Sequence, residues 1–86
     1  MTRYYFHAAD GAQLRDTEGE ELSTLEDAKT IAVDVMAELL SMKRDAFWKR
    51  KMLSVAVKDE TGRLVAVLTT TATFDPVARP EAPPEY

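Results

Sequence analysis

The clearest element of the chain is STLEDAKTIAVDVMAELLSM, which spans residues 23–42. Its apolar side chains recur at spacings of three and four, the pattern of one face of an amphipathic helix. Ser23 and Glu26 match a capping box, in which the Ser side chain accepts a hydrogen bond from the first turn. No Gly or Pro interrupts residues 24–51, so we expect one continuous helix that ends near residues 45–48. The apolar face comprises Leu25, Ala28, Ala32, Val35, Leu39 and Met42.

The residues after this helix predict a β-hairpin. Over residues 52–58, Leu53, Val55 and Val57 alternate with smaller or polar side chains, which is the period of a half-buried strand. The sequence DETG at 59–62 predicts a turn whose glycine takes a left-handed conformation. Residues 63–73 are rich in β-branched side chains and predict a long return strand.

The residues before the helix predict a shorter hairpin. Residues 3–9 are rich in aromatic side chains and indicate a strand. Asp10-Gly11 is typical of a two-residue type I′ turn, because both turn positions need a positive φ. Residues 12–15 then form a short return strand, and the acidic residues 16–21 form a solvated loop.

These elements follow the order strand, strand, helix, strand, strand (ββαββ). We therefore expect an α+β fold, in which a small antiparallel sheet of two hairpins carries one amphipathic helix on one face. Residues 1–74 form this single domain. All four prolines lie in residues 75–86, which we expect to form a flexible Pro-rich tail.

The composition excludes several kinds of site. The chain has 86 residues, no Cys and one His, so it offers no disulfide, no thiolate nucleophile and no Cys-ligated metal. His7 with Asp10, Asp16 or Glu18 comes nearest to an acid–base or metal site, but such a site also needs a third group and a cleft. We expect no enzyme activity, no catalytic residue, no cofactor and no metal. No apolar run approaches the roughly 20 residues that cross a bilayer, so we expect a cytoplasmic protein without a membrane partner.

Two strands are apolar on both faces, and one helix can cover only one face. Residues 4–6 are consecutive aromatics, so the first strand presents aromatic side chains to both faces of the sheet. Residues 64–68 are apolar on both faces as well, without the alternation of a half-exposed strand. This pattern predicts a surface covered by a protein partner, most simply a second copy in a homodimer. The predicted surface comprises Tyr4, Tyr5, Phe6, Val65 and Val67.

A basic cluster near the helix end contrasts with the net charge of −4. Bases interleaved with aromatic side chains bind nucleic acid through phosphate contact and stacking, although the acidic net charge opposes this. Cations at a helix C-terminus also stabilise the helix dipole, and they could dock on an acidic protein. A nucleic-acid-associated protein is therefore the alternative to an interaction module. The cluster comprises Lys43, Arg44, Trp48, Lys49, Arg50 and Lys51.

Four motifs occur together in a fixed order: Arg3-Tyr4-Tyr5-Phe6-His7, Asp10-Gly11, Asp16-x-x-Gly19-x-Glu21-Leu22 and Asp59-x-x-Gly62-Arg63. With these motifs, residues 3–70 resemble the bacterial family of small proteins known as domain-of-unknown-function family 6894. The Thr-rich last strand and the Pro-rich tail depart from the usual ending of that family. The resemblance implies a compact bacterial cytoplasmic domain and carries no activity over to any residue.

Overall fold

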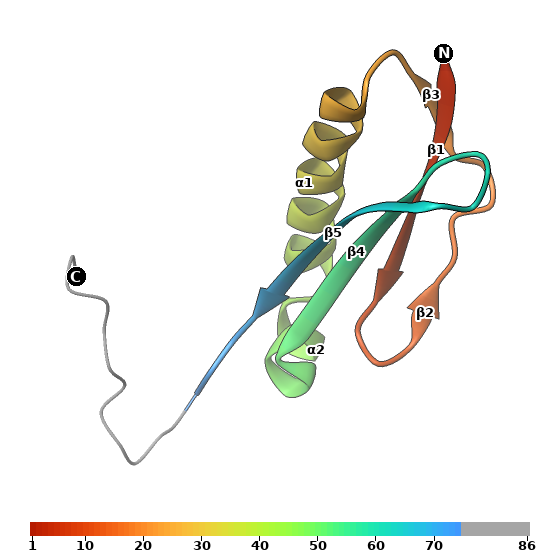
Figure 1. The fold of residues 1–86 in the computed structure, drawn as a ribbon. Helices are drawn as coiled ribbons and strands as arrows, with labels where there is room; N and C mark the ends of the chain where they lie inside the picture. The colour runs from red at the N-terminus through yellow and green to blue at the C-terminus, as the bar shows by residue number, and fades with distance from the viewer. Residues whose placement is uncertain (75–86) are drawn as a thin grey trace.

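Residues 1–74 form an α+β fold with two helices and a five-stranded antiparallel sheet (Figure 1). The computed structural model describes residues 1–74, so the expected tail at 75–86 lies outside the described residues. The sheet order is β2-β1-β4-β5, and β3 pairs with the other end of the same edge of β1. In chain order the elements are β1 (Thr2–Ala9), β2 (Gln13–Leu14), β3 (Glu20–Leu22), α1 (Leu25–Met42), α2 (Arg44–Arg50), β4 (Met52–Lys58) and β5 (Leu64–Thr71).

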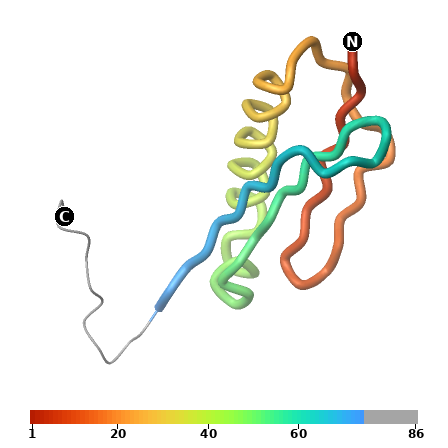
Figure 2. Tube along the Cα trace, in the orientation of Figure 1, coloured from red at the N-terminus to blue at the C-terminus, as the bar shows by residue number. Residues whose placement is uncertain are grey.

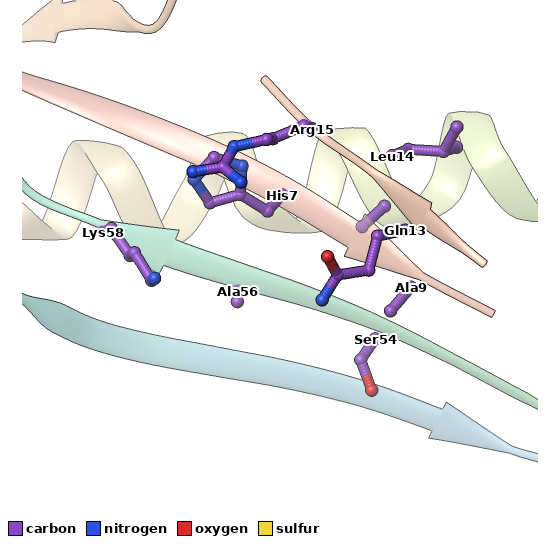
Figure 3. A pocket seen from close by; sticks show the side chains of 9 residues that line it. His7, Ala9, Gln13, Leu14, Arg15, Ser54, Ala56 and Lys58 are labelled. Carbon is purple, nitrogen blue, oxygen red and sulfur yellow. The ribbon is translucent and has the colours of Figure 1, made fainter. Parts of the chain in front are cut away.

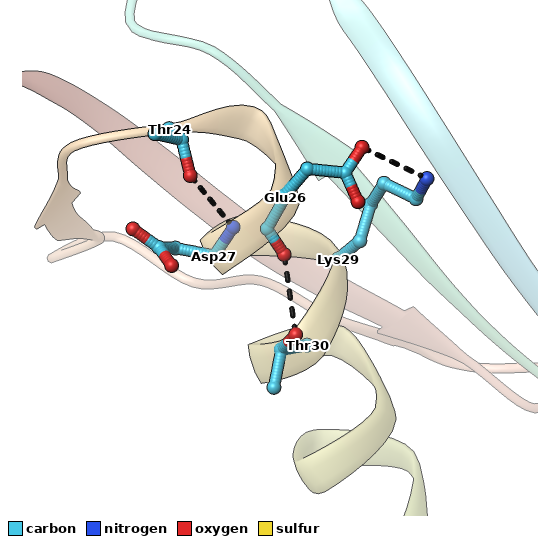
Figure 4. Close-up of polar contacts among 5 residues, drawn as sticks. All are labelled: Thr24, Glu26, Asp27, Lys29 and Thr30. Carbon is cyan, nitrogen blue, oxygen red and sulfur yellow. Dashed lines mark hydrogen bonds and ion pairs between the residues drawn. The ribbon is translucent and has the colours of Figure 1, made fainter.

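Helix α1 begins one residue later than the capping-box pattern predicted. The N-cap is Thr24, not Ser23, and its side-chain oxygen accepts a hydrogen bond from the Asp27 amide at 3.0 Å (Figure 4). Thr24 has an extended backbone, as N-cap residues do. Glu26 forms an ion pair with Lys29 at 3.3 Å, so its side chain stabilises the first turn in a different way.

The prediction of one continuous helix was wrong at Lys43. This residue leaves the helical conformation (φ −115°, ψ 36°) and separates α1 from the seven-residue helix α2. The change of direction packs Phe47 of α2 against the core, and it brings the Lys43 ammonium within 3.5 Å of Asp10. Since neither Gly nor Pro marks the break, these tertiary contacts decide where α1 ends.

The core lies between α1 and one face of the sheet. Its sheet side comes from even-numbered residues of β1 and odd-numbered residues of β4, which fixes the face that each side chain occupies. Small side chains on α1 allow the helix to approach the sheet closely. The buried residues are Tyr4, Ala8, Leu53, Val55 and Val57 in the strands and Ala28, Ala32 and Met36 in α1.

The turn between β4 and β5 confirms the predicted left-handed glycine. Gly62 has φ 84°, and its amide donates to the Asp59 carbonyl at 3.0 Å. The Asp59 carboxylate accepts from the hydroxyl and amide of Thr61 and from the amide of Arg63. The Thr61 hydroxyl is the largest influence that holds the pKa of Asp59 below its ordinary value. A register shift at the start of β5 leaves Val65 without a direct partner on β4.

The first hairpin differs from its prediction in two respects. Ala9 pairs with Gln13, so three residues connect the strands instead of two, and Gly11 takes the positive φ of 107°. The acidic segment is not only a loop, because Glu20–Leu22 forms β3 against the start of β1. In Figure 2 the chain from β2 to β3 runs along the outer side of β1.

Candidate functional site

The five residues predicted to form one partner surface are divided between the two faces of the sheet. Tyr4 is only 8% exposed and belongs to the core. Phe6 and Val65 also pack against the core. Tyr5 and Val67 are on the opposite side, the open face, which no element of residues 1–74 covers. The five residues therefore do not form one surface, because strand parity and the shift at Val65 turn three of them toward α1.

The open face is more polar than the sequence predicted. Tyr5 and His7 stack there with their ring centroids 6.3 Å apart and their planes 5° from parallel. The partners of His7 and Tyr5 on β4 are Ala56 and Lys58, respectively. Ser54 and Thr69 approach each other with their hydroxyl oxygens 3.2 Å apart. The face therefore mixes aromatic, basic and hydroxyl groups with the exposed apolar side chains of Met52, Leu64 and Val67.

His7 and Asp16 have structural roles at the outer edge of β1. The Asp16 amide donates to Nδ1 of His7 at 3.1 Å, and the Phe6 amide donates to the Asp16 carboxylate at 3.0 Å. This carboxylate also accepts from the amides of Glu18 and Gly19, both at 3.0 Å. In the gap between β2 and β3, Asp16 thus supplies the hydrogen-bond acceptor that a neighbouring strand would otherwise offer to the middle of β1.

The electrostatics of Asp16 follow from these contacts. Burial acts to raise the pKa of its carboxyl group. The hydrogen bonds from the three backbone amides outweigh burial, so the pKa lies below its ordinary value. The carboxylate is therefore held as an anion that orders the loop, with its acceptor positions directed to the backbone.

Two residues of the predicted basic cluster are turned toward the first hairpin. Lys43 forms the ion pair with Asp10, and the guanidinium of Arg50 lies beside Gly11. The pKa of Asp10 lies below its ordinary value, first because its carboxylate accepts from the Ala12 amide and then because of the Lys43 and Arg50 charges. Part of the cluster is thus neutralised within the domain, and nucleic-acid binding by the remainder stays a prediction.

Trp48, the aromatic residue of the cluster, lies among other aromatic side chains. Trp48 is 53% exposed and makes edge-to-face contacts with Phe47 and Phe74, with centroid distances of 6.2 and 6.3 Å. Trp48, Lys51 and Phe74 line a shallow depression. Trp48 therefore bridges α2 and the residues after β5, and Arg44, Lys49 and Lys51 remain at the surface around it.

The last strand, β5, forms the second edge of the sheet. Within residues 1–74 it pairs only with β4, so its other side is free (Figure 1). Val33 of α1 and Val67 of β5 are 56% and 55% exposed. Both line a narrow cavity of about 190 Å³ between the helix and this strand. Exposed apolar side chains thus flank the free edge, Val33 on the helix side and Val67 on the open face, a feature that the sequence did not reveal because it joins residues from two distant elements.

Residues 1–74 also bear on two other kinds of site, metal centres and membrane spans. Among the residues that the structure describes, no three His, Asp or Glu side chains come together as metal ligands would. Neither helix of that part combines the length and the apolar character needed to span a bilayer.

The comparisons with known proteins identify a family. No curated protein and no solved structure matches this chain. A family model described as a domain of unknown function (DUF6894) matches residues 3–71. The match runs from the start of β1 to the end of β5 and includes the motifs around Asp16, Gly19 and Gly62, whose roles in the loop and the turn are described above. Because the match spans most of the chain, this protein belongs to the DUF6894 family of domains of unknown function.

Proposed function

We propose that this domain is a non-enzymatic interaction module that associates with a second copy of itself through the free edge of β5. The observation that carries the proposal is the composition of this strand, because none of its eight residues is charged. Natural proteins usually protect a free edge with charged residues, with proline or with a covering segment. β5 has neither a charge nor a proline, and its register with β4 is regular from Ala66 to Thr71.

The backbone of β5 is suited to pairing. The Ala72 amide donates to the Lys51 carbonyl at 3.0 Å. Because amides of an antiparallel strand alternate between its two sides, the amides of Val67, Thr69 and Thr71 point away from β4. These donors and the carbonyls of the same residues could bond another strand. The opposite edge of the sheet has no equivalent row, since β2, β3 and Asp16 occupy it.

A second copy is the partner that this edge fits best. Two neutral strands related by a twofold axis pair antiparallel without placing like charges opposite each other. The threonines of residues 69–71 have high β-propensity and pair well across strands. The exposed side chains of Val33 and Val67 would add apolar contact on either side of the new ladder.

The experiment measures molar mass by light scattering across a range of protein concentrations. Thr69→Pro removes one outward amide and leaves the ladder with β4 intact, whereas the matched control Thr69→Ala keeps that amide. We expect the wild type and Thr69→Ala to reach twice the chain mass and Thr69→Pro to remain monomeric. Val67→Lys, which adds a charge at the edge, is expected to give a monomer as well and serves if the proline variant does not fold.

Two results would overturn the proposal. One is a wild type that stays monomeric at the highest concentration. The other is a dimer that persists in both Thr69→Pro and Val67→Lys, with circular dichroism showing both variants folded. If Tyr5→Lys dissociates that persistent dimer, the interface lies on the open face of the sheet and not at β5.

A further inference from the structure

A pocket of about 280 Å³ lies on the open face, over β1 and β4 and beside β2 (Figure 3). It exists because the side chains beneath it are small. His7 pairs with Ala56 across the two strands, and Ala9 pairs with Ser54. Larger side chains from both sides surround this floor, so the pocket arises from the cross-strand register and not from a loop.

The charged groups at the pocket are both basic. Arg15 and Lys58 line it, and no Asp or Glu does. None of the ion pairs within residues 1–74 involves either of them. In Figure 3 the guanidinium of Arg15 lies beside β1 near His7, while the Lys58 amine reaches toward Ala56 from β4. Two cations that have no ion-pair partner among residues 1–74 thus line one small pocket, in a chain whose net charge is −4.

Neutral donors complete the lining. Because Nδ1 of His7 accepts the Asp16 amide at 3.1 Å, the neutral imidazole carries its proton on Nε2 and remains a donor there. The side-chain amide of Gln13 extends from β2 toward β4 in Figure 3. The carboxylate of Asp16 does not line the pocket, and it accepts from three backbone amides instead of forming an ion pair with Arg15 or Lys58.

We infer that this pocket binds a phosphate group, either free phosphate or the monoester of a small molecule. A guanidinium recognises phosphate through paired N–H donors, and a lysine adds a second positive charge. A phosphate monoester carries close to two negative charges near neutral pH, which matches two cations better than a carboxylate does. The volume lies just below the range of drug-sized ligand sites, so the pocket suits a small group and not a whole nucleotide.

This inference does not depend on self-association. The pocket is formed by β1, β2 and β4, whereas the proposed dimer uses the outer edge of β5. A monomeric Thr69→Pro variant is therefore expected to bind phosphate as the wild type does. Failure of one proposal leaves the other standing.

The test is a titration with inorganic phosphate followed by amide chemical shifts, with sodium chloride at equal ionic strength as the reference. We expect saturable shifts at the amides of Ala9, Ser54 and Ala56. Arg15→Gln and Lys58→Gln should each weaken binding about tenfold. The matched control Arg44→Gln removes the same charge from α2, which contributes no residue to the pocket, and should leave the affinity unchanged. Ala56→Ile, which fills the pocket and keeps both cations, should abolish binding.

Parallel titrations with phenyl phosphate and acetate identify the ligand class. Binding of phenyl phosphate tighter than that of inorganic phosphate assigns a monoester, and equal or weaker binding assigns free phosphate. Acetate should bind more weakly than either. The inference is overturned if phosphate causes no more shift than chloride, if Arg44→Gln weakens binding as much as Arg15→Gln, if Ala56→Ile binds normally, or if acetate binds as tightly as phosphate.

Discussion

Replacing Gly19 with alanine should destabilise the domain more than the same change at Gly62. Both glycines have a positive φ, 69° and 84°, which an alanine adopts only with strain. A Cβ atom at Gly19 would lie 2.8 Å from the Tyr4 carbonyl oxygen and 2.9 Å from a ring carbon of Tyr5. A Cβ atom at Gly62 meets nothing within 4 Å. The two variants thus share the backbone strain and differ in the contact.

The magnitudes follow from these two terms. The left-handed conformation costs an alanine about 1–2 kcal/mol. Alanine also lowers the conformational entropy of the unfolded chain, which offsets about 0.4–1 kcal/mol of that cost. Gly62→Ala should therefore lower the free energy of unfolding by about 1 kcal/mol. Gly19→Ala adds about 1–3 kcal/mol of overpacking, because the Tyr4 carbonyl belongs to β1 and cannot move away freely. Its total loss should be about 2–4 kcal/mol.

Urea unfolding followed by far-ultraviolet circular dichroism measures both values. The slope with denaturant should be the same in the two variants and the wild type, so that the midpoints report stability. If Gly19→Ala loses no more free energy than Gly62→Ala, the close approach of residue 19 to β1 does not stabilise the fold as we describe. The prediction would be equally wrong if Gly62→Ala were the more damaging change.

Three further predictions concern single side chains. Asp16→Asn should lower the free energy of unfolding by about 1–3 kcal/mol at neutral pH, because it leaves a partly buried amide donor without its charged acceptor. The pKa of Asp16 is lower in the folded protein than in the unfolded chain, so this stabilisation is complete above the unfolded-state pKa and is lost as the pH falls through the folded-state pKa. The urea midpoints of the variant and the wild type should therefore converge in acid. A gap that stays constant with pH would contradict the role given to the Asp16 carboxylate. Thr24→Ala should lower the free energy of unfolding by about 1 kcal/mol, measured by heat or urea, and Ser23→Ala should hardly change it, because only Thr24 caps α1. Equal losses in the two variants would indicate that Ser23 caps the helix as well. Lys51→Gly should stabilise the protein by about 1 kcal/mol, since Lys51 ends α2 with a φ of 62°; a lower unfolding midpoint would show that its side chain contributes more than the strain removes.

The parts of the fold that the sequence predicted are those governed by local chemistry. The strand at Met52–Lys58 has the bounds that its alternating pattern indicated. Gly62 closes its turn as expected, because the need for a positive φ is a property of the turn itself. The α+β class and the antiparallel hairpins follow from the same local signals.

The parts that sequence patterns missed depend on contacts between distant residues. The break at Lys43 follows from the packing of Phe47 and the contact with Asp10. Neither contact is signalled in the sequence by a helix-breaking Gly or Pro. Strand β3 exists only because the start of β1 is available to pair with it. The composition of the pocket was invisible as well, because Arg15 and Lys58 meet only through the register of three strands.

The outer edge of β1 also bears on the self-association that we propose through β5. Asp16 accepts the Phe6 amide between two short strands, so the middle of this edge is not available to another chain. A sheet with one free edge has a valence of one, and its association stops at a pair. A sheet with two free edges would have a valence of two and could add copies without end, as fibres do. The two short strands and the Asp16 carboxylate between them would thus keep the self-association that we propose closed at a pair.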